Sequence, residues 1–179
     1  MKLRGEAALL PSLKYFKPEF HSLITPHPIL WTPGSNPYEV SKAVVQLRML
    51  SGRYRTAMLT RHWGSHRTGI CPAPGCSEQE TLDHILVFCP YYNEMRFRLQ
   101  DLWRCKSDAI IAQLVSQTLS GSPLVLVQFL LDASVHPSVI TLVQEHGPEL
   151  LQRIFHLTRT WCFSIHRLRI QLLRNNPFS

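Results

Sequence analysis

Four residues in the middle of the chain constrain its fold more than any other feature. Cys71, Cys76, His84 and Cys89 follow one another with the spacing Cys-x4-Cys-x7-His-x4-Cys. Three thiolates and one imidazole are a common ligand set for a structural zinc ion, which prefers four such ligands at tetrahedral corners. Four candidates so close together are hard to explain as small apolar core residues alone. We therefore expect a zinc-stabilised segment with no open position for a catalytic water.

The residues around this cluster favour the same interpretation. Pro-Ala-Pro-Gly between the first two cysteines is typical of a tight turn, which lets both sulfur atoms face one point. The stretch 81–88 predicts a short helix that carries His84, with Ser77 and Glu80 as a capping box at its start. Cys89 follows at the end of that helix. A loop therefore supplies two ligands and a helix supplies the other two.

The remaining histidines and cysteines are expected to have roles other than metal binding. His62 and His66 lie close enough in sequence to replace one ligand, and a surface position is the preferred alternative for both. Cys105 and Cys162 fall on apolar helical faces and are expected in the core. The total of five cysteines is odd, and no apolar run long enough for a secretory signal is present. We expect a reducing intracellular compartment, either nucleus or cytoplasm.

The rest of the chain predicts a mainly α fold in three regions. Residues 1–37 are a Pro-rich extended lead-in, 38–106 a basic helix with the CCHC zinc-knuckle-like segment, and 107–179 a C-terminal helical bundle. The most apolar run, 124–131, also fits a buried strand, but helix is preferred because no partner strands are evident; it is too short to cross a membrane. Helices are expected from about residue 37 to Gly52, and at 55–63, 92–102, 108–119, 124–131, after 137 and from 148 towards 174.

Basic residues gather upstream of the cysteine cluster. Lys and Arg number 19 against 12 Asp and Glu, and the first 70 residues hold ten of the basic but only three of the acidic ones. Guanidinium groups bind phosphate through a fixed fork, and aromatic rings stack on unpaired bases. A solvated face whose arginines pair with acids elsewhere is the alternative. The predicted nucleic-acid contacts are Arg48, Arg53, Arg55, Arg61 and Arg67, with Tyr54 and Trp63 as aromatic partners.

The segment CPAPGCSEQETLDHILVFCPYY, residues 71–92, resembles the zinc-binding C-terminal region of non-LTR (LINE-type) retrotransposon reverse transcriptases. That family combines Cys-Pro-x-Cys, an acidic Glu-Thr pair, a helix with a His, and a Cys-Pro followed by aromatic residues. The flanks VSKAVVQLRMLSGRYRTAMLTRHW (40–63) and LTRTWCFSIHRLR (157–169) also resemble sequence near that region. The gap of four residues between the first cysteines is longer than the two that are usual there.

The resemblance implies a role in holding template RNA or target DNA beside a reverse transcriptase domain. It assigns the zinc to Cys71, Cys76, His84 and Cys89, and it implies that the chain is a terminal piece or remnant of such an element, since no Tyr-x-Asp-Asp polymerase motif is present. We expect a non-catalytic, zinc-stabilised nucleic-acid-binding module, because no nucleophile–base set or paired carboxylates stand out. The alternatives are a protein-interaction scaffold that docks on a polymerase domain or on itself, and a relic without selected function.

Overall fold

The structure is a computed structural model of the chain, and it describes Tyr15 and residues 27–30, 36–60, 69–106 and 108–175. Regular structure in these ranges is helical apart from one isolated antiparallel bridge between Ile70 and Gln79, which confirms the prediction of a mainly α fold. The helices are η3 (Pro28–Leu30), α2 (Pro37–Leu50), α3 (Ala57–Thr60), η5 (His84–Phe88), η6 (Pro90–Tyr92), α4 (Asn93–Lys106), α5 (Ala109–Ser120), α6 (Pro123–Leu131), η7 (Ala133–Val135), α7 (Pro137–His146) and α8 (Pro148–Asn175).

Proline begins several of these helices. It occupies the first turn of α2, α6, α7 and α8, where its fixed φ is suitable and its missing N–H is not needed. Asn36 caps α2 by accepting a hydrogen bond from the Tyr38 N–H at 2.9 Å. Asp108 caps α5 as predicted, accepting from the Ile111 N–H at 3.0 Å. The stretch 124–131 lies in α6, so helix was the correct alternative.

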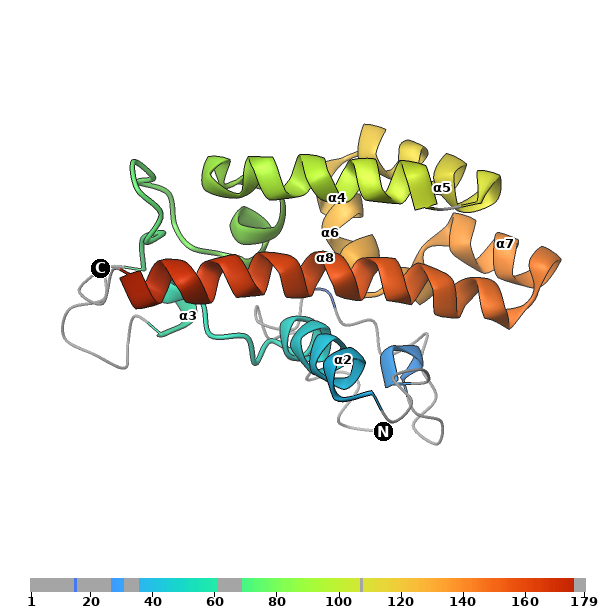
Figure 1. Cartoon of the computed structure of the whole chain (residues 1–179), viewed down its shortest axis with the longest axis horizontal. Helices are drawn as coiled ribbons and strands as arrows, with labels where there is room; N and C mark the ends of the chain where they lie inside the picture. The colour runs from blue at the N-terminus through green and yellow to red at the C-terminus, as the bar shows by residue number, and fades with distance from the viewer. Residues whose placement is uncertain (1–14, 16–26, 31–35, 61–68, 107, 176–179) are drawn as a thin grey trace.

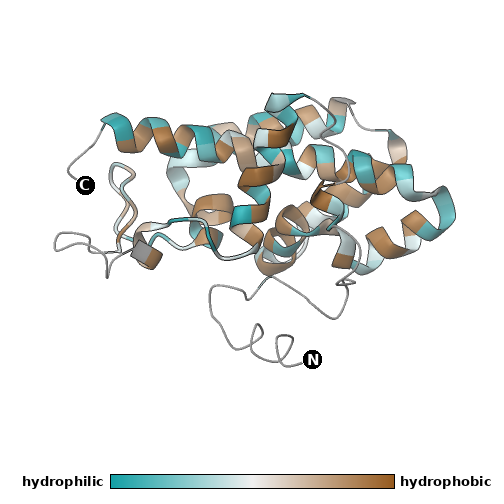
Figure 2. Ribbon diagram, turned by 90° about the horizontal axis from the view of Figure 1, so that it is seen from below, coloured by the Kyte–Doolittle hydropathy of each residue, from teal (hydrophilic) through white to brown (hydrophobic). Residues whose placement is uncertain are grey.

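The long helix α8 is the element on which the others assemble. Its 28 residues span about 42 Å, and α2, α4, α6 and α7 pack against it. Figure 1 shows α2 and α4 on opposite sides of α8. Most of the apolar stripe of α8 is thereby buried inside the protein. Figure 2 shows hydrophobic and hydrophilic residues alternating along the helices, as expected for amphipathic helices around a core.

Two tryptophans mark the centre of the core. Trp103 of α4 and Trp161 of α8 are fully buried, and their ring centroids lie 5.0 Å apart. Phe129 of α6 packs edge-on against Trp103 at 6.4 Å. The core cluster extends from Tyr15 to Leu172 and contains residues from all three of the regions expected from the sequence. The segment with the clustered cysteines and the C-terminal helices therefore share one core.

The two cysteines outside the central cluster lie in different environments. Cys162 is buried on α8, as predicted. Cys105 is exposed near the end of α4, so the expectation of a core position was wrong. The reason is helical geometry: Cys105 lies two residues, or about 200°, around the helix from the buried Trp103. The neighbouring apolar stripe therefore faces the core while Cys105 faces solvent.

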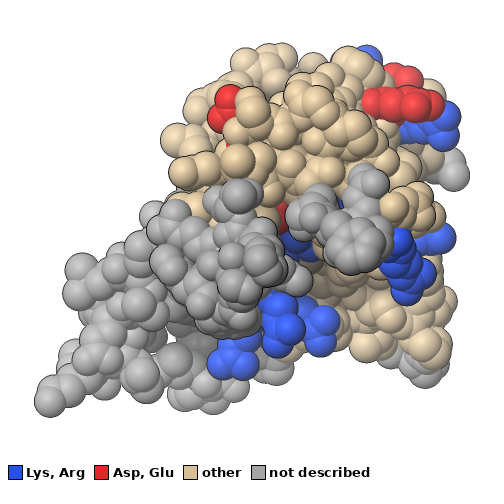
Figure 3. Space-filling model, turned by 90° about the vertical axis from the view of Figure 1, so that its left-hand side faces the viewer, with Lys and Arg blue, Asp and Glu red and all other residues tan. Residues whose placement is uncertain are grey.

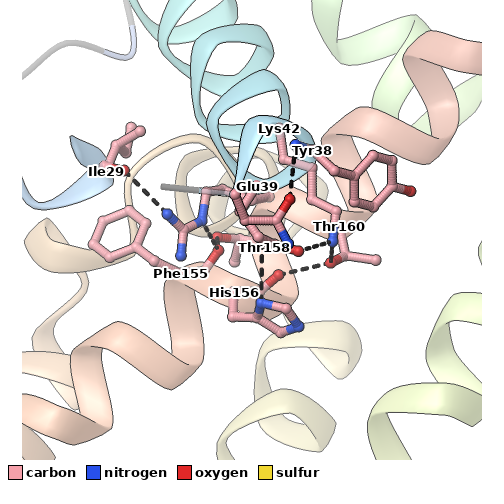
Figure 4. A network of polar contacts seen from close by, with 10 residues as sticks. Ile29, Tyr38, Glu39, Lys42, Phe155, His156, Thr158 and Thr160 are labelled. Atoms are coloured by element: carbon pink, nitrogen blue, oxygen red, sulfur yellow. Dashed lines mark hydrogen bonds and ion pairs between the residues drawn. The ribbon is translucent and has the colours of Figure 1, made fainter. Parts of the chain in front are cut away.

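Polar contacts join α2 to α8 across the core (Figure 4). Gln46 is fully buried, and its side-chain amide donates to Thr158 Oγ1 at 3.0 Å and to the Leu130 carbonyl at 2.6 Å. Nearer the start of α2, Glu39 Oε2 lies 3.4 Å from His156 Nδ1. The Gln46 contacts fix how α2 lies on α8, because a shift of either helix would leave buried polar groups without partners.

Candidate metal centre and arginine groove

A small hairpin brings the first two cysteines together. The Cys71 N–H donates to the Glu78 carbonyl at 2.8 Å, and the Glu80 N–H donates to the Gly69 carbonyl at 2.9 Å. Between the arms, the Cys76 N–H donates to the Ala73 carbonyl at 3.0 Å and closes a tight turn. Gly75 adopts a φ of 73° in that turn, a left-handed conformation that glycine takes without strain. The expected turn is therefore present.

The other two ligands come from a wide helical turn. The Cys89 N–H donates to the His84 carbonyl at 2.7 Å, the i→i+5 hydrogen bond of a π-helix, where the sequence predicted an ordinary short helix. In an α-helix these residues would lie about 140° apart around the axis, and the wider turn reduces that angle. The cap also differs from the predicted Ser77–Glu80 box: Thr81 Oγ1 accepts the His84 N–H at 3.2 Å.

All four predicted ligand atoms converge on one point. The Cys71 and Cys89 sulfur atoms are 3.7 Å apart, and Cys76 Sγ lies 3.3 Å from His84 Nε2. All four atoms are within 4.8 Å of one another. A tetrahedral zinc ion with Zn–S bonds of about 2.3 Å places its sulfurs about 3.8 Å apart. The cysteines form no disulfide, so the cluster can hold a metal ion.

The electrostatics of the cluster fit a cation. Burial, with the neighbouring Cys89 and Cys76 sulfurs, raises the pKa of the Cys71 thiol. Burial likewise raises the pKa of Cys89 and lowers that of His84, which favours the neutral imidazole. Three thiolates in such a place are stable only when a positive charge accompanies them. A divalent cation supplies that charge and replaces the thiol protons.

A buried arginine that the sequence argument did not single out supports the wide turn. Arg96 of α4 donates to the Cys89 carbonyl, to Asn93 Oδ1 at 2.6 Å and to the Ile85 carbonyl at 3.4 Å. The side chain is only 6% exposed. It satisfies carbonyl groups at the end of the turn and places a positive charge beside the sulfur cluster. Arg96 lies on the buried side of α4, and this position is the sequence feature from which its burial could have been predicted.

A second buried arginine joins the metal segment to α8. Arg169 donates from Nε and Nη2 to the two carboxylate oxygens of Glu80, each at 2.8 Å. Glu80 also accepts the N–H of Ala57, at the start of α3. The Arg169 guanidinium lies 5.5 Å from the centroid of the Tyr54 ring. Through one carboxylate, Glu80 therefore links α3, α8 and the hairpin that carries Cys71 and Cys76.

Three of the predicted phosphate contacts lie on one open hollow beside this link. We call it the arginine groove; it has a volume of about 730 Å³ and is lined by Arg48, Arg53, Arg55, Leu59, His166 and Ile170, among others. All three of these arginines are exposed. Figure 3, seen from the end of the molecule where α3 lies, shows Lys and Arg side chains gathered on this face. The structure thus brings together three arginines from α2 and the turn after it.

Tyr54 does not face solvent, although the sequence predicted it as a base-stacking residue. It is only 7% exposed, and its hydroxyl lies 3.0 Å from His166 Nδ1. Burial raises the pKa of Tyr54 to about 12, so its hydroxyl stays protonated. Burial, with Arg169 and Arg48 nearby, lowers the pKa of His166, so a neutral imidazole can accept a hydrogen bond from that hydroxyl. The ring therefore supports the groove from inside, and it does not fit the role of an exposed stacking platform.

The remaining predicted contacts and alternative ligands, Arg61, Trp63, Arg67, His62 and His66, lie outside the described residues. In the part of the chain that is described, no helix is long and apolar enough to cross a membrane. Comparison with family models, with curated proteins and with solved structures found no match to this chain.

Proposed function

We propose that the chain is a non-catalytic, zinc-stabilised module that binds the phosphate backbone of RNA or DNA. Cys71, Cys76, His84 and Cys89 hold the zinc, which folds the segment 71–89. The arginines of the groove contact the phosphates. An origin in a LINE-type reverse transcriptase, with a polymerase domain as partner, belongs to the same proposal and rests on the sequence resemblance.

The choice of zinc rests on the donor set. Three thiolates and an imidazole are soft or borderline ligands, which zinc accepts in tetrahedral geometry and which magnesium and calcium avoid. The cluster is also largely buried, as is usual for a site that stabilises a fold. With four protein ligands no position is left for a substrate or water, so the proposed role of the metal is structural.

The observation that carries the nucleic-acid proposal is the arginine groove. Within the described residues, Arg48 and Arg53 form no ion pair, so their charge is not neutralised by a carboxylate. Guanidinium groups that lie exposed and unpaired on one concave surface suit a polyanion, because they pair with phosphate bidentately. Burying such unpaired charges against an uncharged partner would be unfavourable.

Fluorescence anisotropy with a labelled single-stranded RNA over a salt series tests this proposal. Three phosphate contacts predict a slope of about −2 in a plot of log K against log salt concentration for a single strand. An Arg53→Ala/Arg55→Ala variant should bind more weakly at low salt, with a slope about 1.5 units shallower. Arg104→Ala, which removes an exposed arginine on α4, is the matched control and should behave like the wild type. Absent or salt-independent binding would refute the proposal.

A protein-interaction scaffold is the second candidate, and exposed aromatic side chains favour it. Phe88, Tyr91 and Phe97 follow the metal hairpin and are 51%, 43% and 62% exposed. Exposed aromatic residues are enriched at protein interfaces. Light scattering after size exclusion, with and without a Phe97→Ser substitution, tests whether they mediate self-association. A monomer at all concentrations, together with RNA binding, would favour the first candidate.

A further inference from the structure

The arginine groove is not lined by charge alone. Besides four arginines, apolar side chains from three elements line it: Val45 of α2, Leu59 of α3 and Ile170 of α8. Val45 is only 6% exposed, whereas Leu59 is 37% exposed. A surface that only attracts phosphate does not need an apolar interior. The ligand should therefore carry an apolar or aromatic part as well as negative charge.

We propose that the arginine groove binds an unpaired nucleotide, with the base against Leu59 and Ile170 and the flanking phosphates on Arg48, Arg53 and Arg55. This inference rests on the proposed nucleic-acid function and names the class of ligand: single-stranded nucleic acid or an unpaired position in a longer strand. Small-molecule pockets have volumes of roughly 300–1,000 Å³. The groove, at about 730 Å³, falls within that range.

A duplex fits the same groove poorly. Its bases are stacked inside the double helix, so only phosphates and the edges of base pairs reach a protein surface. A hollow of this size then stays unfilled, and its apolar side chains remain in contact with water. An unpaired base can leave the stack, lie on the aliphatic side chains and place its ring over a guanidinium plane. Single-stranded nucleic acid therefore uses both kinds of lining residue.

Three 12-nucleotide probes of one sequence test the proposal with the full-length, metal-loaded protein. They are a single-stranded RNA, the same strand with abasic residues at every position, and the duplex form. We expect the abasic strand to bind about fivefold and the duplex about tenfold more weakly than the intact strand at the same salt concentration. All three probes should show salt dependence, because phosphate contacts contribute to each.

Two variants separate the base contact from the phosphate contacts. Leu59→Ala should weaken binding of the intact strand about fivefold, leave binding of the abasic strand nearly unchanged and keep the salt slope. Arg53→Ala should weaken both strands equally and make the slope shallower by about 0.7. Leu124→Ala on α6, another exposed leucine, is the control for the first, and Arg104→Ala on α4 is the control for the second. Far-UV circular dichroism checks that each variant is folded.

The outcomes distinguish this inference from the broader proposal. Equal binding of intact and abasic strands, or of strand and duplex, would overturn the unpaired-nucleotide site while leaving phosphate binding in place. Loss of abasic-strand binding in Leu59→Ala would show that the leucine acts through the fold and would also overturn the base contact. No binding of any probe would refute the nucleic-acid function itself, and the inference with it.

Discussion

Arg169 and Glu80 form a two-point ion pair in the interior of the protein, with both N···O distances at 2.8 Å. The side chain of Glu80 is fully buried and that of Arg169 is 8% exposed. Glu80 lies between the candidate ligands Cys76 and His84, whereas Arg169 lies near the end of α8 and borders the arginine groove. The pair therefore connects the segment that carries the candidate metal cluster to the groove through protein side chains.

Replacing Glu80 by Gln should strongly destabilise the protein. The substitution leaves the buried Arg169 guanidinium without a counter-charge, a change that typically lowers the free energy of unfolding by about 3–5 kcal/mol. Urea unfolding at pH 7, followed by circular dichroism, measures the difference. Glu94→Gln is the matched control, because Glu94 pairs with Arg98 at an exposed position on α4. Loss of this exposed pair should lower the free energy of unfolding by about 1 kcal/mol or less. Similar losses for the two variants would contradict this role for Glu80.

Metal removal should change thiol reactivity in a defined way. In the metal-loaded protein we expect only the exposed Cys105 to react rapidly with a thiol reagent. A strong chelator should make Cys71, Cys76 and Cys89 reactive as well, while the buried Cys162 reacts only after unfolding. Elemental analysis should find one zinc ion per chain. Structural zinc sites contribute on the order of 10 kcal/mol of binding free energy, so chelation should also lower the unfolding midpoint.

A Cys105→Ser variant provides the control for this titration. It should remove the rapid reaction of the loaded protein and leave the three chelator-dependent thiols unchanged. Rapid reaction of four thiols before chelator is added would mean that no metal protects the cluster. Three chelator-dependent thiols without zinc would show that another metal occupies it.

Asp108→Ala should lower stability in a pH-dependent way. The Asp108 carboxylate accepts a hydrogen bond from the Ile111 N–H and forms an ion pair with Arg153 at 2.7 Å. Both contacts lower the pKa of this carboxyl below its ordinary value of 3.8. Stability from the ionised cap is therefore fully present above about pH 4 and is lost as the pH falls through the folded-state pKa. At pH 7 the substitution should decrease the free energy of unfolding by about 1 kcal/mol.

Denaturation at several pH values between 7 and 2 measures this effect, and the two proteins should converge at the acidic end. Ser122→Ala is the control, because Ser122 occupies the same position before α6 but its side chain makes no capping hydrogen bond. A constant difference between wild type and Asp108→Ala over the whole pH range would contradict the assigned cause.

Substitutions of Trp161 should separate packing from hydrogen bonding in the core. Its indole Nε1 is buried and, within the described residues, has no hydrogen-bond partner. Trp161→Ala should lower the free energy of unfolding by about 3–5 kcal/mol through the cavity that it leaves. Trp161→Phe should have a clearly smaller effect, because it also removes an unsatisfied donor. Equal effects in urea unfolding would mean that the indole nitrogen is hydrogen-bonded, for example to water.

Local patterns in the sequence predicted the helices and the ligand set. Asn36 and Asp108 cap helices because a capping side chain binds an N–H two or three residues ahead, a relationship that the sequence displays directly. The four ligands were predictable for a similar reason: a hairpin and one helical turn bring them together within the segment 71–89. Their spacing alone indicated a metal site. The spacing did not reveal the wide turn between His84 and Cys89.

Only the tertiary structure decided what the residues between these local patterns do. Glu80 pairs with Arg169, 89 positions along the chain, and Tyr54 is covered by α8 instead of facing a base. One signal was present, since Arg169 falls on the apolar stripe of α8 with Ile165 and Leu172 and so needed a buried partner. A stripe shows that a residue is buried, but the identity of its partner depends on how distant elements pack. Spacing along the chain carries no information on that packing, because it is set by the shape of the whole core.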